Sequence, residues 1–145
     1  MKLKLLAGAT LLVAASAVYA QNDPIAARRA ILKGFGDATK APAAMLKGEE
    51  KFDLAKVQTA LKTYSDGAKK LPALFPDNSK TGGDTAALPK IWEDKTRFES
   101  LYAKLGQDAA ANMTAIVDEA SFKREFPKQL GDCKACHDDY RAKKQ

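Results

Sequence analysis

Histidine and cysteine are scarce in this 145-residue chain, which has one histidine and two cysteines. It lacks strand-like alternation of useful length and any internal repeat, which argues against a β-sheet or repeat architecture. It has no long basic run and no aromatic platform, so nothing indicates nucleic-acid binding. After residue 20, no apolar run reaches the ~20 residues that a membrane span needs. What remains is a mildly basic chain of formal net charge +6 with interspersed charges.

Residues 1–20 have the features of a secretory signal peptide. A basic start with Lys2 and Lys4 is followed by an apolar stretch and by small residues that end at Ala20. A transmembrane anchor is the alternative, but the apolar stretch is shorter than a span. We therefore expect cleavage after Ala20, export, and one mature domain formed by residues 21–145.

Both cysteines and the histidine belong to one motif, Cys133-Lys134-Ala135-Cys136-His137. Cys-x-x-Cys-His is the attachment site of a c-type haem. Two thiols three residues apart on a helical turn can each add to one vinyl group of the same porphyrin, and the following histidine can ligate the iron. We expect one covalent haem c, attached through Cys133 and Cys136, with His137 as axial ligand. In an exported chain, such a haem indicates the periplasm.

Two other uses of the cysteine pair remain open at this point. A disulfide between Cys133 and Cys136 would close a very short loop, which adds little chain-entropy stability. A thiol–disulfide oxidoreductase would need a low-pKa thiolate at a helix start in a β-rich setting. The pair instead lies late in a predicted helix of a chain without predicted strands.

Apolar residues at spacings of three and four predict four helices, over residues 24–46, 53–74, 89–117 and 119–143. The seam of the second helix is the most regular: Leu54, Val57, Leu61, Tyr64, Ala68 and Leu71. A turn-rich loop, residues 75–88, separates the second helix from the third. The predicted fold is all-α, an antiparallel up-down-up-down four-helix bundle with covalently bound haem.

This topology sets which residues lie level with the iron. The end of the fourth helix and the start of the first share one end of the bundle, and the helical rise puts His137 ~10 Å and Leu32 ~12 Å from it. Leu32 and Phe35 should therefore face the iron from the side opposite His137. Met45, ~30 Å along the bundle, and Met113 are too far away to ligate. The iron is predicted to be five-coordinate with an apolar distal side, which suits NO and CO but offers bound O₂ no hydrogen-bond donor.

The chain resembles the cytochromes c′, the class II c-type cytochromes, over essentially the whole mature sequence. The resemblance rests on three stretches: residues 131–141 around the haem motif, Gly82-Gly83-Asp84 followed by Pro89-Lys90-Ile91-Trp92, and Lys47-Gly48 after a helix carrying Arg28 and Leu32.

The resemblance implies roles for further residues. Arg28 would approach a haem propionate, where a guanidinium suits a carboxylate. Arg29 and Asp84 would be further haem contacts, and Arg141 would lie by the proximal pocket. Leu32 falls where cytochromes c′ have an apolar distal residue and low-spin relatives have a methionine ligand. Leucine there favours the high-spin branch.

We therefore expect a periplasmic haem protein, not an enzyme, that binds NO or CO at a five-coordinate high-spin iron and could transfer single electrons. The alternative is a low-spin, six-coordinate class II cytochrome that is a simple electron carrier. The resemblance also implies a homodimer through the first two helices. Basic residues of the fourth helix could dock an acidic redox partner of unknown identity, or could simply form a solvated face. No nucleic-acid partner is expected, and no membrane contact after signal cleavage.

Overall fold

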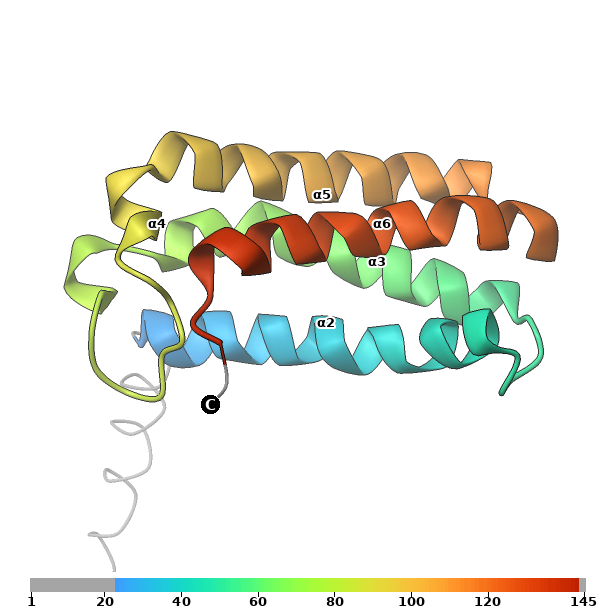
Figure 1. Ribbon diagram of the computed structural model, residues 1–145, viewed down its shortest axis with the longest axis horizontal. Coiled ribbons are helices and arrows are strands. Elements are labelled where there is room, and N and C mark those ends of the chain that lie inside the picture. The colour runs from blue at the N-terminus through green and yellow to red at the C-terminus, as the bar shows by residue number, and fades with distance from the viewer. Residues whose placement is uncertain (1–22, 144–145) are drawn as a thin grey trace, which may run out of the picture.

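The computed structural model describes residues 23–143, which form a bundle of long antiparallel helices (Figure 1). The long helices are α2 (Pro24–Lys47), α3 (Leu54–Lys70), α5 (Lys95–Ala115) and α6 (Glu119–Tyr140). As predicted, α6 ends at the end of the bundle where α2 begins (Figure 1). The predicted four-helix bundle is confirmed. The expected signal peptide, residues 1–20, lies outside the described residues.

Side chains at the helix ends explain where helices begin and stop. At the start of α2, Asp23 Oδ1 accepts a hydrogen bond from the backbone N–H of Ile25 (2.8 Å). Gly48 follows α2 with φ 77°, a left-handed conformation that glycine adopts without the usual steric penalty. Asp118 and Ser121 form a capping box at the start of α6. Within residues 23–143, no helix combines the length and apolar character that crossing a membrane requires.

The prediction of one continuous third helix over residues 89–117 was wrong. The short helix α4 (Lys90–Glu93) stops at Asp94, whose backbone leaves the helical region (φ −131°, ψ 59°). The Asp94 carboxylate then accepts a hydrogen bond from the backbone N–H of Arg97 (3.3 Å) and so begins α5. Asp94 was the available signal of this break, because aspartate is a common N-cap. The apolar periodicity on both sides of it instead suggested one continuous helix.

The second predicted helix, residues 53–74, is α-helical only as far as Lys70. It continues as the 3₁₀ turn η1 (Leu71–Leu74), where Pro72 has no N–H to donate to an α-helical hydrogen bond. A second 3₁₀ turn, η2 (Asp77–Ser79), lies within the following loop.

The loop between η2 and α4 pairs with the segment that follows α6. Two backbone hydrogen bonds join them: Leu88 N–H to the Tyr140 carbonyl (3.0 Å), and Ala142 N–H to the Ala86 carbonyl (2.8 Å). Between these bonds, Arg141 is extended and forms an isolated antiparallel bridge with Ala87. This pairing of residues 86–88 with 140–142 is called the clasp below. It ends α6 at Tyr140, so the prediction of a helix to residue 143 was wrong.

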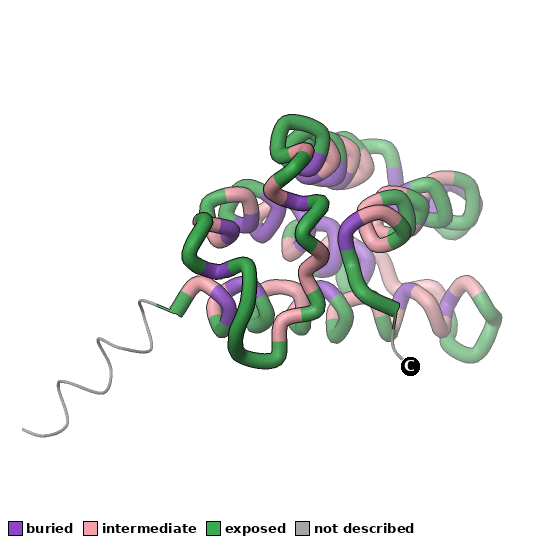
Figure 2. The backbone as a smooth tube through the Cα atoms, turned by 60° about the vertical axis from the view of Figure 1, so that its left-hand side comes forward, coloured by how far each residue is buried: buried purple, intermediate pink, exposed green. Residues whose placement is uncertain are grey.

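One side of the bundle is packed less closely than the other three. α2 packs on α3, α3 on α5 and α5 on α6, whereas α2 and α6 form no such close interface. Buried residues gather on the sides of the helices that face the bundle interior (Figure 2). An aromatic group fills the interior near the clasp: the Phe98 ring centroid is 5.0 Å from that of Tyr102 and 5.2 Å from that of Tyr140. The α2–α6 side is therefore where a large apolar group can be accommodated.

Candidate functional site

Two adjoining cavities, together called the cleft, lie between α2, α5 and α6. Their volumes are about 310 Å³ and about 90 Å³. Five residues line both: Leu32, Tyr102, Cys136, His137 and Arg141. Most other side chains of the larger cavity are apolar. Because the lining is shared, the two cavities form one site, which contains the haem motif predicted from the sequence.

α6 presents the side chains of Cys133, Cys136 and His137 to the cleft. Residues at positions i, i+3 and i+4 share a face of an α-helix, which is why this spacing brings all three together. Both cysteines are free thiols. Burial, and secondarily the neighbouring Cys133, raises the pKa of Cys136 to about 11, and burial also raises the pKa of Cys133. A redox-active thiol needs a lowered pKa, so these surroundings do not favour the oxidoreductase alternative.

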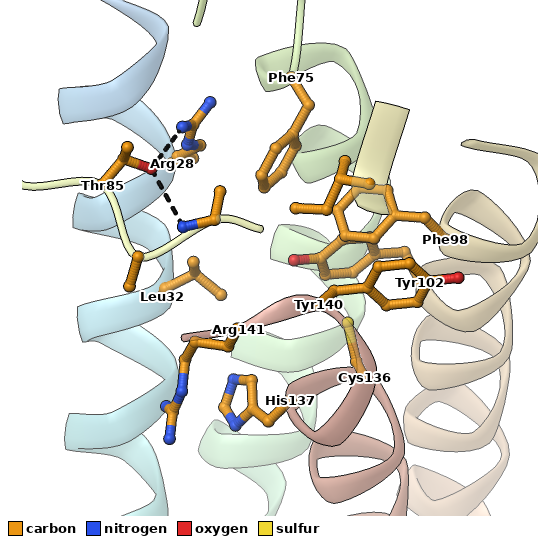
Figure 3. A pocket seen from close by; sticks show the side chains of 13 residues that line it. Arg28, Leu32, Phe75, Thr85, Phe98, Tyr102, Cys136, His137, Tyr140 and Arg141 are labelled. Carbon is orange, nitrogen blue, oxygen red and sulfur yellow. Dashed lines mark hydrogen bonds between the residues drawn. The ribbon is translucent and has the colours of Figure 1, made fainter. Parts of the chain in front are cut away.

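His137 lines the cleft from α6, and Leu32 lines it from α2 (Figure 3). Burial, and then the positive charge of Arg141, lowers the pKa of His137. Both effects favour the neutral imidazole, which is the form that binds metals. Arg141 itself lines both cavities beside His137.

The structure brings Leu32 and Phe35 of α2 into the cleft with His137. Met45 instead lines a separate surface hollow with residues from the start of α6, at the other end of the bundle. The carbonyl of Met113 accepts a hydrogen bond from Gln58 Nε2 (2.9 Å), away from the cleft. In the part of the chain that the structure describes, no methionine or lysine lines the cleft.

Arg28 is buried, with 2% of its surface exposed, and lines the smaller cavity. Its two terminal nitrogens donate four hydrogen bonds: to the Leu74 carbonyl (3.1 Å), Ser79 Oγ (2.8 Å), the Ser79 carbonyl (3.0 Å) and Thr85 Oγ1 (2.7 Å). Its guanidinium carbon also lies 4.5 Å from the centre of the Phe75 ring. Arg28 therefore anchors the loop over the cleft, in addition to any contact with a haem propionate.

Arg29 and Asp84 form an ion pair at the surface, with 3.1 Å between Nη1 and Oδ2. Their side chains are 52% and 85% exposed, and neither lines either cavity. Of the haem contacts that the family resemblance implied, these two therefore lie farthest from the cleft.

Tyr102 of α5 is a cleft residue that the sequence reading did not single out. It is buried, and burial, followed by the neighbouring Cys136, raises its pKa well above the usual range. Its place four residues after Phe98 in the apolar seam was the available signal. Residues 85–87 also line the smaller cavity. They do so because the clasp brings them there, and no local sequence pattern reveals the clasp.

The basic residues on α6 are mostly paired with acidic ones. The pairs are Lys123–Glu119 (2.6 Å), Arg124–Glu125 (2.7 Å), Lys128–Glu125 (2.8 Å) and Lys134–Asp138. This pairing favours the solvated-face interpretation of the helix over a basic docking surface.

Comparison with known proteins decides the family, because the cytochrome c′ family profile matches residues 23–141. The chain belongs to the cytochrome c′ family. A cytochrome c′ from Rhodopseudomonas palustris is 59% identical over 145 residues, which cover 99% of each chain. A solved structure of cytochrome c′ from the same species superposes with a TM-score of 0.84 at 62% identity, covering 86% of this chain and 99% of that one. A cytochrome c-556 from Agrobacterium fabrum is 41% identical over 147 residues, 99% of each chain.

The family resemblance expected from the sequence is thus confirmed, and with it the cofactor: cytochromes c′ bind haem c covalently. They are haem carriers rather than conventional enzymes. The residues present fit this group, since two free thiols and an imidazole from one helix line an apolar cleft. The cleft also lies on the side where the bundle is not closed by helix packing.

Proposed function

We propose that this chain is an exported haem protein whose iron is five-coordinate and high spin, and which binds NO or CO and can also transfer single electrons. The observation that supports this most directly is the lining opposite His137. Leu32 and Phe35 line the cleft from α2, where the sequence predicts the distal side, and among residues 23–143 no second histidine, methionine or lysine reaches the cleft. Within these residues the cleft therefore offers no second imidazole, and no thioether or amine, for a sixth coordination position.

In this proposal, Cys133 and Cys136 form the two thioether bonds to the haem, and His137 is the axial ligand of the iron. Arg141 lies beside His137 and contributes a positive charge on the proximal side. Arg28 lies at the smaller cavity and would approach a propionate there. When bound, the haem supplies the redox-active iron that takes the diatomic ligand.

The apolar α2 side of the cleft explains the preference for NO and CO. Leu32 and Phe35 carry no hydrogen-bond donor. The remaining polar side chain of α2 in the larger cavity, Thr39, donates its hydroxyl to the Phe35 carbonyl (2.7 Å) and also contacts the Tyr64 hydroxyl (2.7 Å). Bound O₂, which carries partial negative charge, gains little from such surroundings, whereas NO and CO need no donor.

Absorption and electron paramagnetic resonance spectra of the purified ferric and ferrous protein, with and without NO and CO, test this proposal. High-spin spectra without added ligand are expected, with a clear change when either gas is added. Low-spin spectra in both oxidation states without ligand would overturn the open site and support the alternative of a six-coordinate electron carrier.

A Leu32→Met variant provides a matched control for these spectra. Its thioether would extend from α2 into the cleft that His137 also lines, so the variant is expected to shift toward a low-spin spectrum. If Leu32→Met stayed high spin and bound CO like the parent protein, Leu32 would not lie opposite the iron.

Export through residues 1–20 and a periplasmic location are part of the same proposal. Mass spectrometry of the protein recovered from the periplasm is expected to find Gln21 at the amino terminus. Recovery from the cytoplasm with residues 1–20 intact would contradict it.

We also propose a homodimer formed through α2 and α3. A cytochrome c′ of known structure that is 24% identical to this chain shows ligand-controlled dimer dissociation. Sedimentation velocity of the purified haem protein is expected to give the mass of a dimer, and a monomer at micromolar concentration would contradict this assembly.

A further inference from the structure

Gly67 of α3 lies against the tip of the Phe35 ring. A Cβ atom at position 67 would lie 2.3 Å from Phe35 Cε1, 2.6 Å from Phe35 Cζ and 2.8 Å from Ile31 Cγ2. Non-bonded carbon atoms prefer separations of about 3.5–4.0 Å. Even a methyl group at position 67 therefore requires the Phe35 ring to move.

Two neighbours restrict how the Phe35 ring can move. The ring packs edge-on against Tyr64, with centroids 5.5 Å apart and planes at 80°. Tyr64 is fully buried, and its hydroxyl is hydrogen-bonded to Thr39 (2.7 Å), which restrains its ring. The backbone of α3 at Gly67 bounds a second side. Phe35 also lines the larger cavity.

We propose that Gly67 is a specificity-determining position for gas binding, although it lies outside the cleft. Because Gly67 has no side chain, the Phe35 ring can pack against α3. The position of that ring sets the space beside Leu32 that is available to a ligand. A side chain at position 67 would push Phe35 into the cleft and slow the binding of ligands. This inference rests on the function proposed above.

The rate of CO binding to the ferrous protein, measured by stopped flow, tests the proposal in Gly67→Ala. The expected association rate is about tenfold lower, which corresponds to about 1.4 kcal/mol in the barrier. The larger ligand ethyl isocyanide should be slowed more than CO. Gly34→Ala is the matched control: it is also a helical glycine, but a Cβ there meets no atom within 4 Å. Its rates should equal those of the parent protein.

Making Gly67→Ala in Phe35→Leu protein as well distinguishes displacement of the Phe35 ring from a general disturbance of the bundle. Leucine at position 35 lacks the Cε1 and Cζ atoms that a Cβ at position 67 would meet, and the remaining close atom, Ile31 Cγ2, belongs to a residue that does not line the cleft. In Phe35→Leu protein, adding Gly67→Ala should therefore leave the CO association rate unchanged. An equal slowing in both backgrounds, or no slowing in either, would overturn the proposal.

A crystal structure of the Gly67→Ala haem protein gives a readout that does not depend on ligand binding. The Phe35 ring should be displaced toward the cleft, and an unmoved ring with α2 and α3 pushed apart would overturn the inference. If the parent protein bound no CO, the function proposed above would fail, while this structure would still show whether Gly67 positions Phe35.

Discussion

Arg28 and Arg29 are adjacent in the sequence, yet their replacement by methionine should have very different effects on stability. Arg28 is almost fully buried, and its terminal nitrogens donate four hydrogen bonds to the segment between η1 and the clasp. Arg29 makes one exposed ion pair with Asp84. The pair of variants therefore compares an internal anchor with a surface contact, using the same substitution in the same helix.

The magnitudes follow from these contacts. Methionine retains much of the apolar stem of arginine but has no donor. A hydrogen bond to a charged group contributes about 1.5–3 kcal/mol, and such contributions are not additive within one network. Arg28→Met removes the charged donor and leaves neutral buried acceptors without a partner, which costs about 1–3 kcal/mol, and we expect the variant to fall in this range. An exposed ion pair contributes about 0–1 kcal/mol, so Arg29→Met should be nearly neutral.

Urea unfolding of the purified haem protein measures the two free energies. Hydrogen exchange at the Leu88 and Ala142 amides, which form the clasp, reports the local effect. Arg28→Met should unfold at lower urea and exchange faster at both amides, whereas Arg29→Met should do neither. Equal losses in the two variants, or a loss below about 1 kcal/mol for Arg28→Met, would refute the reasoning, because typical hydrogen bonds alone contribute that much.

Three further predictions concern other parts of the molecule. Leu32→Ala should speed CO association about tenfold, as expected if the side chain adds about 1.4 kcal/mol to the barrier, and an unchanged rate would remove Leu32 from the ligand path. Cys136→Ser should leave the haem attached through Cys133 alone, so mass spectrometry should find haem on the unfolded chain and the pyridine haemochrome band should shift; an unshifted band would contradict the second thioether. Hydrogen bonds from Ser121 hold the pKa of Asp118 below its usual 3.8, so the stability that Asp118 contributes is present above that pH and is lost as pH falls through the lower folded-state value. Asp118→Asn keeps a capping side chain that does not titrate, and its urea midpoint should fall less between pH 5 and pH 2 than that of the parent protein; equal falls would contradict the assignment.

Features that depend on short stretches of sequence could be predicted. The spacing of Cys133, Cys136 and His137 was sufficient to place the motif on one face of a helix. The predicted bounds of the first helix, residues 24–46, lie close to those of α2, because its caps, Asp23 and Gly48, are its neighbours in the sequence. Helical rise and chain direction were sufficient to expect Leu32 and His137 at the same level of the bundle.

Features that depend on contacts between distant segments could not be predicted. Residue 87 joins the site only through its pairing with Arg141, and nothing near it in the sequence indicates that partner. The hydrogen bonds that Arg28 donates to Leu74, Ser79 and Thr85 were not foreseen, because these partners lie 46 to 57 residues away in the sequence. The importance of Gly67 arises where α3 approaches α2, and a glycine inside a helix gives no hint of what lies opposite.

The two sides of the cleft would hold the haem in different ways, because they are formed by different helices. In the proposed arrangement, every covalent or coordinate bond to the haem comes from α6, through Cys133, Cys136 and His137. The α2 side contributes packing through Leu32 and Phe35, without a bond and without a close backbone interface to α6. Small outward excursions of α2 side chains can therefore admit a gas molecule while no bond to the iron or the porphyrin is stretched. The rate at which ligands arrive and the chemistry of the iron can consequently change independently, one through mutations in α2 and α3 and the other through mutations in α6.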